Sequence, residues 1–238
     1  MKVSGTIAPA YNVQTAVDAA HALIVTHAVT LDAADNRSLE PMAEAAKKAL
    51  SVESLNIVAD TGYSNGEQAE HCEQAGIIPH VPAARSVNAN GLLDRNAFTY
   101  APESDSFLFP EGKKLKRVQL SRKDRAIYYQ AAATDCGSCA RKAQCTQASR
   151  RMITRHLHDE ALNRMHARAT PVLMRLRRST VEHPFGTLKY RIFGHPRLLL
   201  RGLNGARTEI GFAVMAYNLK RMLNLIGVAQ LTQRLAAS

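Results

Sequence analysis

The chain has 238 residues, of which 46% are hydrophobic and 21% are charged, and this composition is typical of one globular core with room for a small insertion. It has no run of the roughly 18 uncharged apolar residues that a membrane helix needs. The first ten residues lack the apolar core of a signal peptide. We therefore predict a cytoplasmic protein with no membrane partner.

The net charge of +11 is unevenly distributed. Residues 1–110 carry 6 basic and 13 acidic residues, whereas residues 111–238 carry 25 basic and 7 acidic residues. Basic helices are often only solvated faces, so charge alone does not identify a ligand. A pI of about 9.8, with the positive charge concentrated in one half, nevertheless favours nucleic acid as the partner of the basic half.

The N-terminal part begins with strand patterns and continues with a helix pattern. Residues 11–18 alternate apolar and polar side chains and residues 22–30 are β-branched and apolar, which predicts an antiparallel hairpin. Residues 38–50 have helical spacing, with Ser38 as the predicted cap. The predicted buried face of that helix consists of Leu39, Met42, Ala46 and Leu50.

Strand and helix patterns continue up to residue 82. Residues 55–60 form a short apolar run ended by a turn signal, which predicts a strand buried on both faces. Residues 66–76 predict a short helix closed by Gly76, and residues 77–82 predict another strand. This order predicts an α/β fold in which helices cover a mixed sheet.

The later segments differ in character. Asparagine and glycine, a basic stretch at 113–125 and three cysteines interrupt the pattern, so we predict an insertion at 83–154, with a small hairpin of its own. The sequence is helical again from about residue 159, where Pro171 and Pro184 each predict a kink or a boundary. A closing helix is predicted at 207–227, with core positions Ile210, Val214, Tyr217 and Met222.

The predicted domain organisation follows from these segments. Residues 1–82 form the first part of one catalytic domain and residues 155–238 form its helical C-terminal part. The insertion at 83–154 separates them in the sequence.

Three cysteines lie close together in the insertion. Cys136, Cys139 and Cys145 have a spacing that could bind zinc, but a structural zinc site takes four ligands. The fourth ligand could be His156 or His158, or there is none and no metal binds.

Two carboxylates are candidate site residues, and each has a simpler structural explanation. Asp60 ends a predicted strand, where sites of open α/β sheets are built, but an Asp there can also cap the following turn. Glu182 follows Ser179 by three residues, which also fits a capping box. Neither residue alone identifies a function.

The spacing around Glu182 is more specific. Arg178 lies four residues before it and Lys189 lies seven after it, in the pattern R-x3-E-x6-K, and a continuous helix would place both on one face. Here the chain resembles the DDE transposases of bacterial insertion sequences, in the branch with the signature Y-x2-R-x3-E-x6-K. The similar segments are YNVQTAVD, VADTGYSNGE, GIIPHVP, VEHPFGTLK and AYNLKRML, in the same order.

The resemblance implies an RNase-H-like fold in which three carboxylates hold two divalent ions, usually magnesium, for DNA strand cleavage and strand transfer. Asp60 matches the second carboxylate and Glu182 the third. Arg178 and Lys189 match the basic pair that contacts DNA. Carboxylate oxygens suit magnesium, and two ions about 4 Å apart stabilise the attacking and leaving oxygens at phosphorus. The metal would also explain why an acid lies among arginines.

The sequence departs from the family pattern at two positions. Arg175 stands where the signature has Tyr, and Phe109 stands where relatives often have a cysteine. The second departure leaves a four-cysteine site incomplete, so we expect no bound zinc. This expectation argues against a third interpretation, in which the chain is a zinc-dependent regulatory protein.

The resemblance also predicts that the first carboxylate is missing. An RNase-H-like sheet begins with three antiparallel strands, whereas only two precede the helix at 38–50, and the similar YNVQ stretch is the second strand of the family. We therefore expect the C-terminal part of a longer transposase. The alternatives are a non-catalytic DNA-binding remnant, or a complete site in which Asp18 is the first carboxylate rather than a turn cap. The sequence does not determine the target specificity, nor whether the protein forms a homo-oligomer on DNA.

Overall fold

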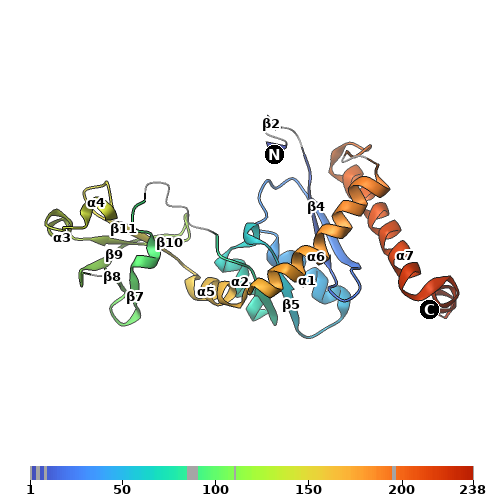
Figure 1. The fold of residues 1–238 in the computed structure, drawn as a ribbon, viewed down its shortest axis with the longest axis horizontal. Coiled ribbons are helices and arrows are strands. Elements are labelled where there is room, and N and C mark those ends of the chain that lie inside the picture. The colour runs from blue at the N-terminus through green and yellow to red at the C-terminus, as the bar shows by residue number, and fades with distance from the viewer. Residues whose placement is uncertain are drawn as a thin grey trace. The chain divides into compact units, whose positions relative to one another are not determined.

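A computed structural model describes residues 2–3, 6–7, 10–84, 91–109, 111–194 and 197–237. The chain divides into two compact units (Figure 1). The first contains residues 1–83 and 162–238, and the second contains residues 84–161. Within the described ranges, no helix is long and apolar enough to cross a membrane.

The first unit contains three two-stranded ladders. Among the described residues, strands β1 (Lys2–Val3) and β2 (Thr6–Ile7) pair with each other alone. Strands β3 (Asn12–Val17) and β4 (Ile24–Thr30) form the predicted antiparallel hairpin, in which Asn12 lies opposite Thr30. The alternating pattern predicted this hairpin, in which β4 buries Ile24 and Val29 and β3 buries the polar Gln14.

Strands β5 (Leu55–Val58) and β6 (Ile77–His80) form a parallel pair. They are joined by the 3₁₀ turn η1 (Thr61–Tyr63) and helix α2 (Gly66–Gln74), and Gly76 ends that connection with a positive φ of 71°. The hydrogen bonds run from Leu55 N to Gly76 O and from Ala59 N to His80 O. The backbone nitrogen of Pro79, which has no N–H to donate, therefore points away from β5. This is the usual position of a proline in an edge strand.

The prediction of one mixed sheet is wrong in one respect. The β3–β4 pair and the β5–β6 pair are separate two-stranded sheets among the described residues. Strand β5 is also only half-buried, although its apolar run predicted burial on both faces. The physical reason is that the edge of β5 opposite β6 has no partner strand in the described part of the chain.

Helix α1 (Leu39–Leu50) packs against strands of both pairs. It buries the predicted Leu39, Met42 and Ala46, but Leu50 at its end is 45% exposed. Ser38 occupies the predicted cap position without making a side-chain cap hydrogen bond. The helix ends instead at Ser51, whose left-handed backbone directs its N–H back to the carbonyls of the last turn.

The C-terminal part of this unit is helical, with α5 (Asp159–Arg168), α6 (Pro171–Thr187), the π-helical turn η4 (Leu188–Ile192) and α7 (Gly202–Ala236). Pro171 is the first residue of α6, as predicted, and the Thr170 hydroxyl caps it. Pro184 lies inside α6, and regular α-helix gives way to the π turn four residues later. Helix α6, labelled in Figure 1, contacts β3 and β5.

Helix α7 closes the core of the first unit against β4. Ile210, Val214 and Tyr217 are buried as predicted, whereas Met222 is only partly buried. The Tyr217 hydroxyl also donates to the carbonyl of Ala22 in the β3–β4 turn, at 2.7 Å. The helix therefore fixes the hairpin through apolar packing and through polar contacts at the turn.

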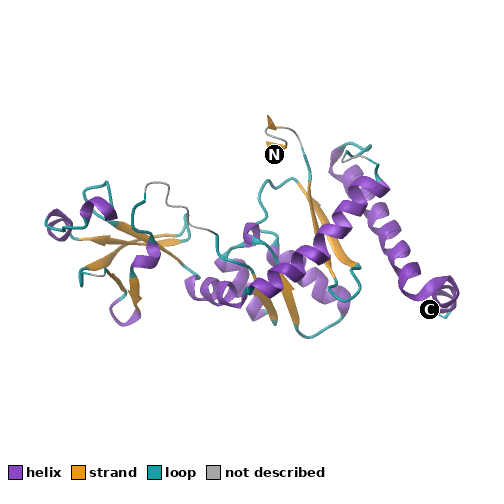
Figure 2. Cartoon of the chain, in the orientation of Figure 1, coloured by secondary structure: helices purple, strands orange, loops and turns teal. Residues whose placement is uncertain are grey.

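The second unit is a five-stranded antiparallel sheet in the order β11-β10-β9-β8-β7, more than the small hairpin that the sequence predicted (Figure 2). Its strands are β7 (Thr99–Ala101), β8 (Ser106–Leu108), β9 (Lys114–Ser121), β10 (Ala126–Ala131) and β11 (Met152–His156). The 3₁₀ turns η2 (Arg95–Ala97) and η3 (Pro102–Ser104) flank β7. The short β7 and β8 carry too few residues for an alternating pattern to be visible in the sequence.

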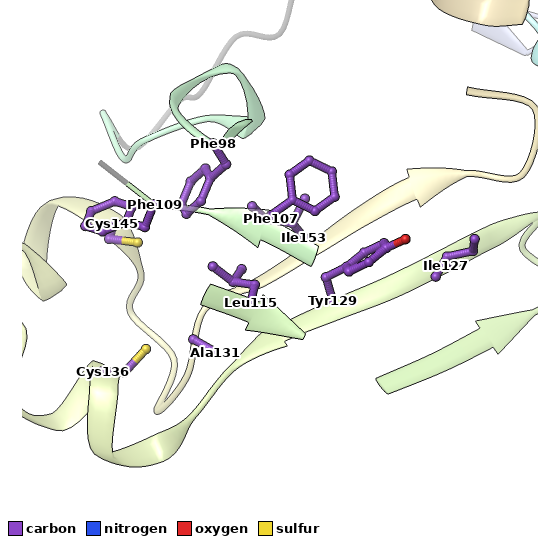
Figure 3. Close-up of a cluster of buried hydrophobic side chains, with 10 residues drawn as sticks. All are labelled: Phe98, Phe107, Phe109, Leu115, Ile127, Tyr129, Ala131, Cys136, Cys145 and Ile153. Atoms are coloured by element: carbon purple, nitrogen blue, oxygen red, sulfur yellow. The ribbon is translucent and has the colours of Figure 1, made fainter. Parts of the chain in front are cut away.

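One face of this sheet forms a tight core (Figure 3). Tyr129, Phe107 and Leu115 are almost fully buried there, and the Phe107 and Tyr129 rings meet edge to face at 5.0 Å between centroids. The short helices α3 (Ala133–Gly137) and α4 (Lys142–Cys145) bring two buried cysteines to the same core.

Candidate functional site

Asp60 follows strand β5 and makes two kinds of contact. Its Oδ1 accepts a hydrogen bond from Gly62 N at 3.0 Å, so it caps the turn that follows the strand. Its Oδ2 accepts from the guanidinium of Arg177 on α6 at 2.7 Å. The Asp60 side chain is 45% exposed and that of Arg177 is 23% exposed. The turn-capping explanation is therefore correct for one oxygen, while the other binds a cation brought from 117 residues away.

A hydrogen-bond network lies beside Asp60. The Tyr63 hydroxyl donates to Gln14 Oε1 on β3, and Gln14 Nε2 donates to Asp35 Oδ1 at 2.6 Å. Asn12 Nδ2 donates to the same Asp35 oxygen at 2.6 Å. Burial and the nearby charges of Asp35 and Asp60 raise the pKa of Tyr63, so its hydroxyl stays a donor. The network joins β3, the segment after β4 and the turn after β5.

Asp35 is a site residue that the sequence reasoning missed. A Cβ placed on Gly62 would lie 3.1 Å from Asp60 Oδ1 and 3.4 Å from Asp35 Oδ2. The two carboxylate oxygens are therefore no farther apart than the sum of these distances. A side chain at this position would lie tight against Asp60 and in van der Waals contact with Asp35. The only signal in the sequence was an acidic loop directly after the second strand.

The face of α6 that meets Asp60 is the one that bears Arg177. Thr180 and Val181 extend the same side of the helix toward β3 and β5. Glu182 is five residues after Arg177, which is more than a third of a turn around the helix from it. The structure therefore places Arg177 in contact with Asp60. The R-x3-E-x6-K spacing did not single out Arg177.

Glu182 itself is exposed on α6. The capping-box explanation for it is wrong, because α6 begins at Pro171 and Ser179 lies inside the helix, where its hydroxyl donates to Leu176 O. Arg178 is exposed one turn before Glu182 and on the same side of the helix. Arg178 and Glu182 therefore share a face of α6, whereas the sequence had predicted a shared face for Arg178 and Lys189.

Lys189 lies beyond the end of the regular helix. It is in the π turn η4, exposed, with its Nζ 5.9 Å from the centroid of the Phe185 ring. The prediction of a continuous helix from Arg178 to Lys189 is wrong, because the helix widens after Thr187. A spacing of eleven residues therefore does not correspond to three α-helical turns here.

Asp18 follows β3 and caps the hairpin turn. Its carboxylate accepts from the backbone N–H groups of His21 at 2.7 Å and Ala20 at 3.3 Å, and it also pairs with the His21 ring. Partial burial opposes ionisation, but these hydrogen bonds prevail and lower the pKa of Asp18. The structure thus shows the turn-capping role that was the alternative to a catalytic one.

A cavity of about 310 Å³ lies inside the first unit, next to Asp60. One wall is β3 from Gln14 to Asp18, and the opposite wall is β5 from Leu55 to Ala59. Helix α1 contributes Leu39 and Met42, and α6 contributes the residues Leu176, Arg177, Thr180, Val181 and Phe185. The Thr15 hydroxyl on the β3 wall is buried with no hydrogen-bond partner among the described residues.

The cavity faces strand edges on both sides. Within the described chain, β3 pairs only with β4, and β5 pairs only with β6. Because Leu55 and Ala59 direct their N–H groups to the β6 segment, alternation directs those of Asn56 and Val58 to the other side, where both residues line the cavity. The opening is therefore bounded by unpaired backbone as well as by apolar side chains.

The described residues contain no preformed metal site. No group of three His, Cys, Asp or Glu side chains there is arranged to hold an ion. In the second unit, Cys136 and Cys145 are buried beside Phe109, and burial raises the pKa of the Cys145 thiol. The expectation that zinc does not bind stays a prediction.

Comparison with known families gives one match. The family described as "Transposase DDE domain" matches residues 5–219. The match includes both units and every candidate site residue named above. Neither the curated proteins nor the solved structures gave a match.

Proposed function

Because the chain belongs to the Transposase DDE domain family, we propose that it acts in DNA transposition through a site in its first unit, built on Asp60 and α6. The substrate is DNA and the reaction is metal-dependent strand cleavage followed by strand transfer. Residues 1–82 and 155–238 belong to one catalytic domain in this proposal, and the segment 83–154 is an insertion.

The observation that carries this proposal is the contact between Asp60 and α6. The Arg177–Asp60 ion pair, at 2.7 Å, ties the carboxyl end of β5 to the helix that bears Arg178 and Glu182. The carboxyl ends of parallel strands are where α/β folds build sites. The ion pair therefore supports a common site for two acidic residues that are far apart in the sequence.

The donor chemistry fits divalent metal, whereas the arrangement is incomplete. Asp60 and Glu182 offer hard carboxylate oxygens, which suit magnesium, and both side chains are at least partly exposed. We propose that these two residues contribute to a divalent-metal site, which would hold two ions when a first carboxylate completes it; the two ions would stabilise the attacking and leaving oxygens at phosphorus. Arg177 occupies Asp60 Oδ2, so its guanidinium must release that oxygen or share it when metal binds.

The remaining cations of α6 and η4 complete the proposed site. Arg178 and Lys189 are exposed, and neither makes an ion pair with a described residue. We propose that they bind DNA phosphates beside Glu182. Their positive charge would hold the backbone in place without reading its sequence.

The cavity supports an RNase-H-like arrangement. One further strand between β3 and β5 would join the two ladders into a single mixed sheet and would satisfy both unpaired edges. In the fold that we propose, that central strand carries the first carboxylate. The described residues place no strand there, and Asp18 is engaged as a turn cap.

A second candidate function is a DNA-binding remnant that lacks catalysis. It is favoured by the Arg177–Asp60 pair and by the absence, among the described residues, of a third carboxylate in metal-binding arrangement. The two functions share DNA as the ligand and differ in metal binding and cleavage.

The test measures Mn²⁺ binding and the nicking of a duplex that carries the ends of the element. We expect Asp60→Asn and Glu182→Gln to abolish Mn²⁺ binding, with Glu44→Gln on the exposed side of α1 as the control. We expect little nicking by the chain alone. If Mn²⁺ binding is unchanged in both variants, the proposed metal site is wrong and the second candidate function, a DNA-binding remnant, is favoured. Robust nicking that Asp18→Ala abolishes would instead show that Asp18 completes the site.

A further inference from the structure

The second unit has a sheet with two unlike faces. Residues directly opposite each other in a ladder point to the same side. Leu115 lies opposite Phe107 and Ala131, and these three belong to the tight core in Figure 3. The neighbouring rung, in which Lys116 lies opposite Gln130, therefore points to the other side, which we call the outer face.

The strand register defines the rest of the outer face. Tyr128 lies opposite Gln119 on β9 and Thr154 on β11, beyond the register shift that follows Tyr128. Lys114 lies two residues before Lys116 and shares its side. The outer face thus includes Lys114, Lys116, Gln119, Tyr128, Gln130 and Thr154, together with Met152 opposite Gln130 and with Leu108 and Ser106 opposite the two lysines. All of these side chains except Ser106 are exposed or partly exposed, even though β9 is the central strand of the sheet.

Positive charge on the outer face is not balanced by acids. None of the five strands contains Asp or Glu. The unit's ion pairs instead engage five other cations, namely Arg95, Lys113, Arg117, Arg141 and Arg155. Lys114 and Lys116 have no ion-pair partner within the described residues, and the β9–β10 turn adds the exposed Arg122 and Lys123.

The charge of the whole unit has the same sign. Residues 84–161 contain 14 basic and 8 acidic residues. One of those acids, Asp124, lies in the β9–β10 turn, where it accepts from the Ser121 and Tyr128 hydroxyls. Four cations without an ion-pair partner among the described residues, Lys114, Lys116, Arg122 and Lys123, therefore lie on β9 and in its turn, and one acid lies at the rim.

We propose that this outer face binds the phosphodiester backbone of DNA. Charge complementarity selects a polyanion, and the glutamine, threonine and tyrosine side chains are the uncharged groups that commonly contact phosphate and sugar. Lys114 and Lys116 are about 6.8 Å apart along the strand, close to the rise of two nucleotides in one strand of a duplex. Its polar and charged side chains outnumber apolar ones such as Met152 and Leu108, which favours DNA over a protein partner.

This proposal deepens the proposed function, because it rests on DNA as the ligand, but it places a contact in a different unit from Asp60 and Glu182. It needs neither metal nor cleavage. DNA binding through the outer face can therefore be measured with EDTA present, under conditions in which strand cleavage does not occur.

The experiment measures binding of the full-length chain to a 30-base-pair duplex by fluorescence anisotropy, with EDTA, from 50 to 200 mM salt. The variant is Lys114→Gln with Lys116→Gln. The control is Lys48→Gln with Lys142→Gln, which removes the same charge from one exposed and one partly exposed position outside the outer face. We expect the variant to lose on the order of tenfold in affinity at 50 mM salt and its salt slope to fall by about 1.8, since each phosphate contact contributes about 0.9.

The control should bind like the unmodified chain. Circular dichroism shows whether the variant remains folded, and restoring Lys116 alone should recover about half of the change in slope, which a folding defect would not do. A variant with the salt slope of the control would overturn the outer-face proposal while leaving the proposed function intact. Failure of the unmodified chain to bind any duplex would overturn both.

Discussion

The two units differ in how the edges of their strands are paired. In the second unit, five strands form one ladder whose inner face is tightly packed around Phe107 and Tyr129. In the first unit, four of the strands form two separate pairs that face each other across a cavity of about 310 Å³. The proposed catalytic residues lie beside this cavity, whereas the tightly packed unit bears the proposed backbone-binding face. Stable packing and the proposed chemistry are thus assigned to different parts of the chain.

The largest expected difference between the units concerns removal of a large side chain. Phe107→Ala in the packed core should lower the free energy of unfolding of the second unit by about 3–5 kcal/mol, because it creates a new cavity. Val181→Ala enlarges a cavity that already exists, so we expect a loss of about 1 kcal/mol or less in the first unit. Urea unfolding followed by peptide-resolved hydrogen exchange measures the two units separately. Equal losses would contradict the difference in packing.

Adding volume should have opposite effects in the two units. Ala16→Val places two methyl groups on the β3 wall of the cavity and should stabilise the first unit by about 1 kcal/mol. Ala131→Val adds the same groups to the packed core and should destabilise the second unit by about 1–3 kcal/mol. The same unfolding measurement compares them. Destabilisation by both substitutions would mean that the cavity cannot accept side chains.

The pH dependence of the first unit should include one ion-pair cluster. Hydrogen bonds from Arg164, and then from Arg168, lower the pKa of Glu73 below its ordinary value of 4.5, although partial burial opposes this. The stabilisation is therefore complete above pH 4.5 and is lost as the pH falls through the lowered value. Glu73→Gln should remove this part of the acid dependence. Its cost at pH 7, measured by urea unfolding, should be about 1 kcal/mol or less, because the Arg164 side chain is 49% exposed. An unchanged acid profile would show that Glu73 does not contribute.

The smallest effect is expected at the site itself. Arg177→Met should change the unfolding free energy by less than about 1 kcal/mol, because the Asp60 carboxylate is half exposed and retains its bond from Gly62. The same variant should bind Mn²⁺ more tightly, since Asp60 Oδ2 no longer carries a cation. Calorimetric titration of both forms measures this. Weaker Mn²⁺ binding would assign Arg177 a positioning role.

Local patterns predicted the elements, whereas the pairing of distant elements was not predictable from them. The β3–β4 hairpin, α1, α2 and the start of α6 at Pro171 follow from alternation, helical spacing and capping signals, which act within a few residues. The five-stranded sheet escaped prediction because it includes short strands without a clear period and pairs residues as far apart as Ala126 and His156.

The candidate site was predicted in part. Asp60 was found because it ends a strand at the edge where α/β sheets build sites and because its segment resembles the family, and its turn-capping role was also anticipated. Arg177 and Asp35 were missed because their contacts depend on the rotation of α6 and on the path of the loop after β4. The π turn at Lys189 was missed for a similar reason, since Pro184 signals disruption without showing how the helix accommodates it.

The central claim is that the sheet of the first unit is open between β3 and β5, and amide hydrogen exchange in β5 tests it most directly. The N–H groups of Leu55 and Ala59 bond to the β6 segment, whereas those of Asn56 and Val58 face the cavity. NMR-detected exchange of the full-length chain should therefore show slow exchange at Leu55 and Ala59 and much faster exchange at Asn56 and Val58. Uniformly slow exchange at all four residues would show that the free edge of β5 is already paired, and would contradict the account.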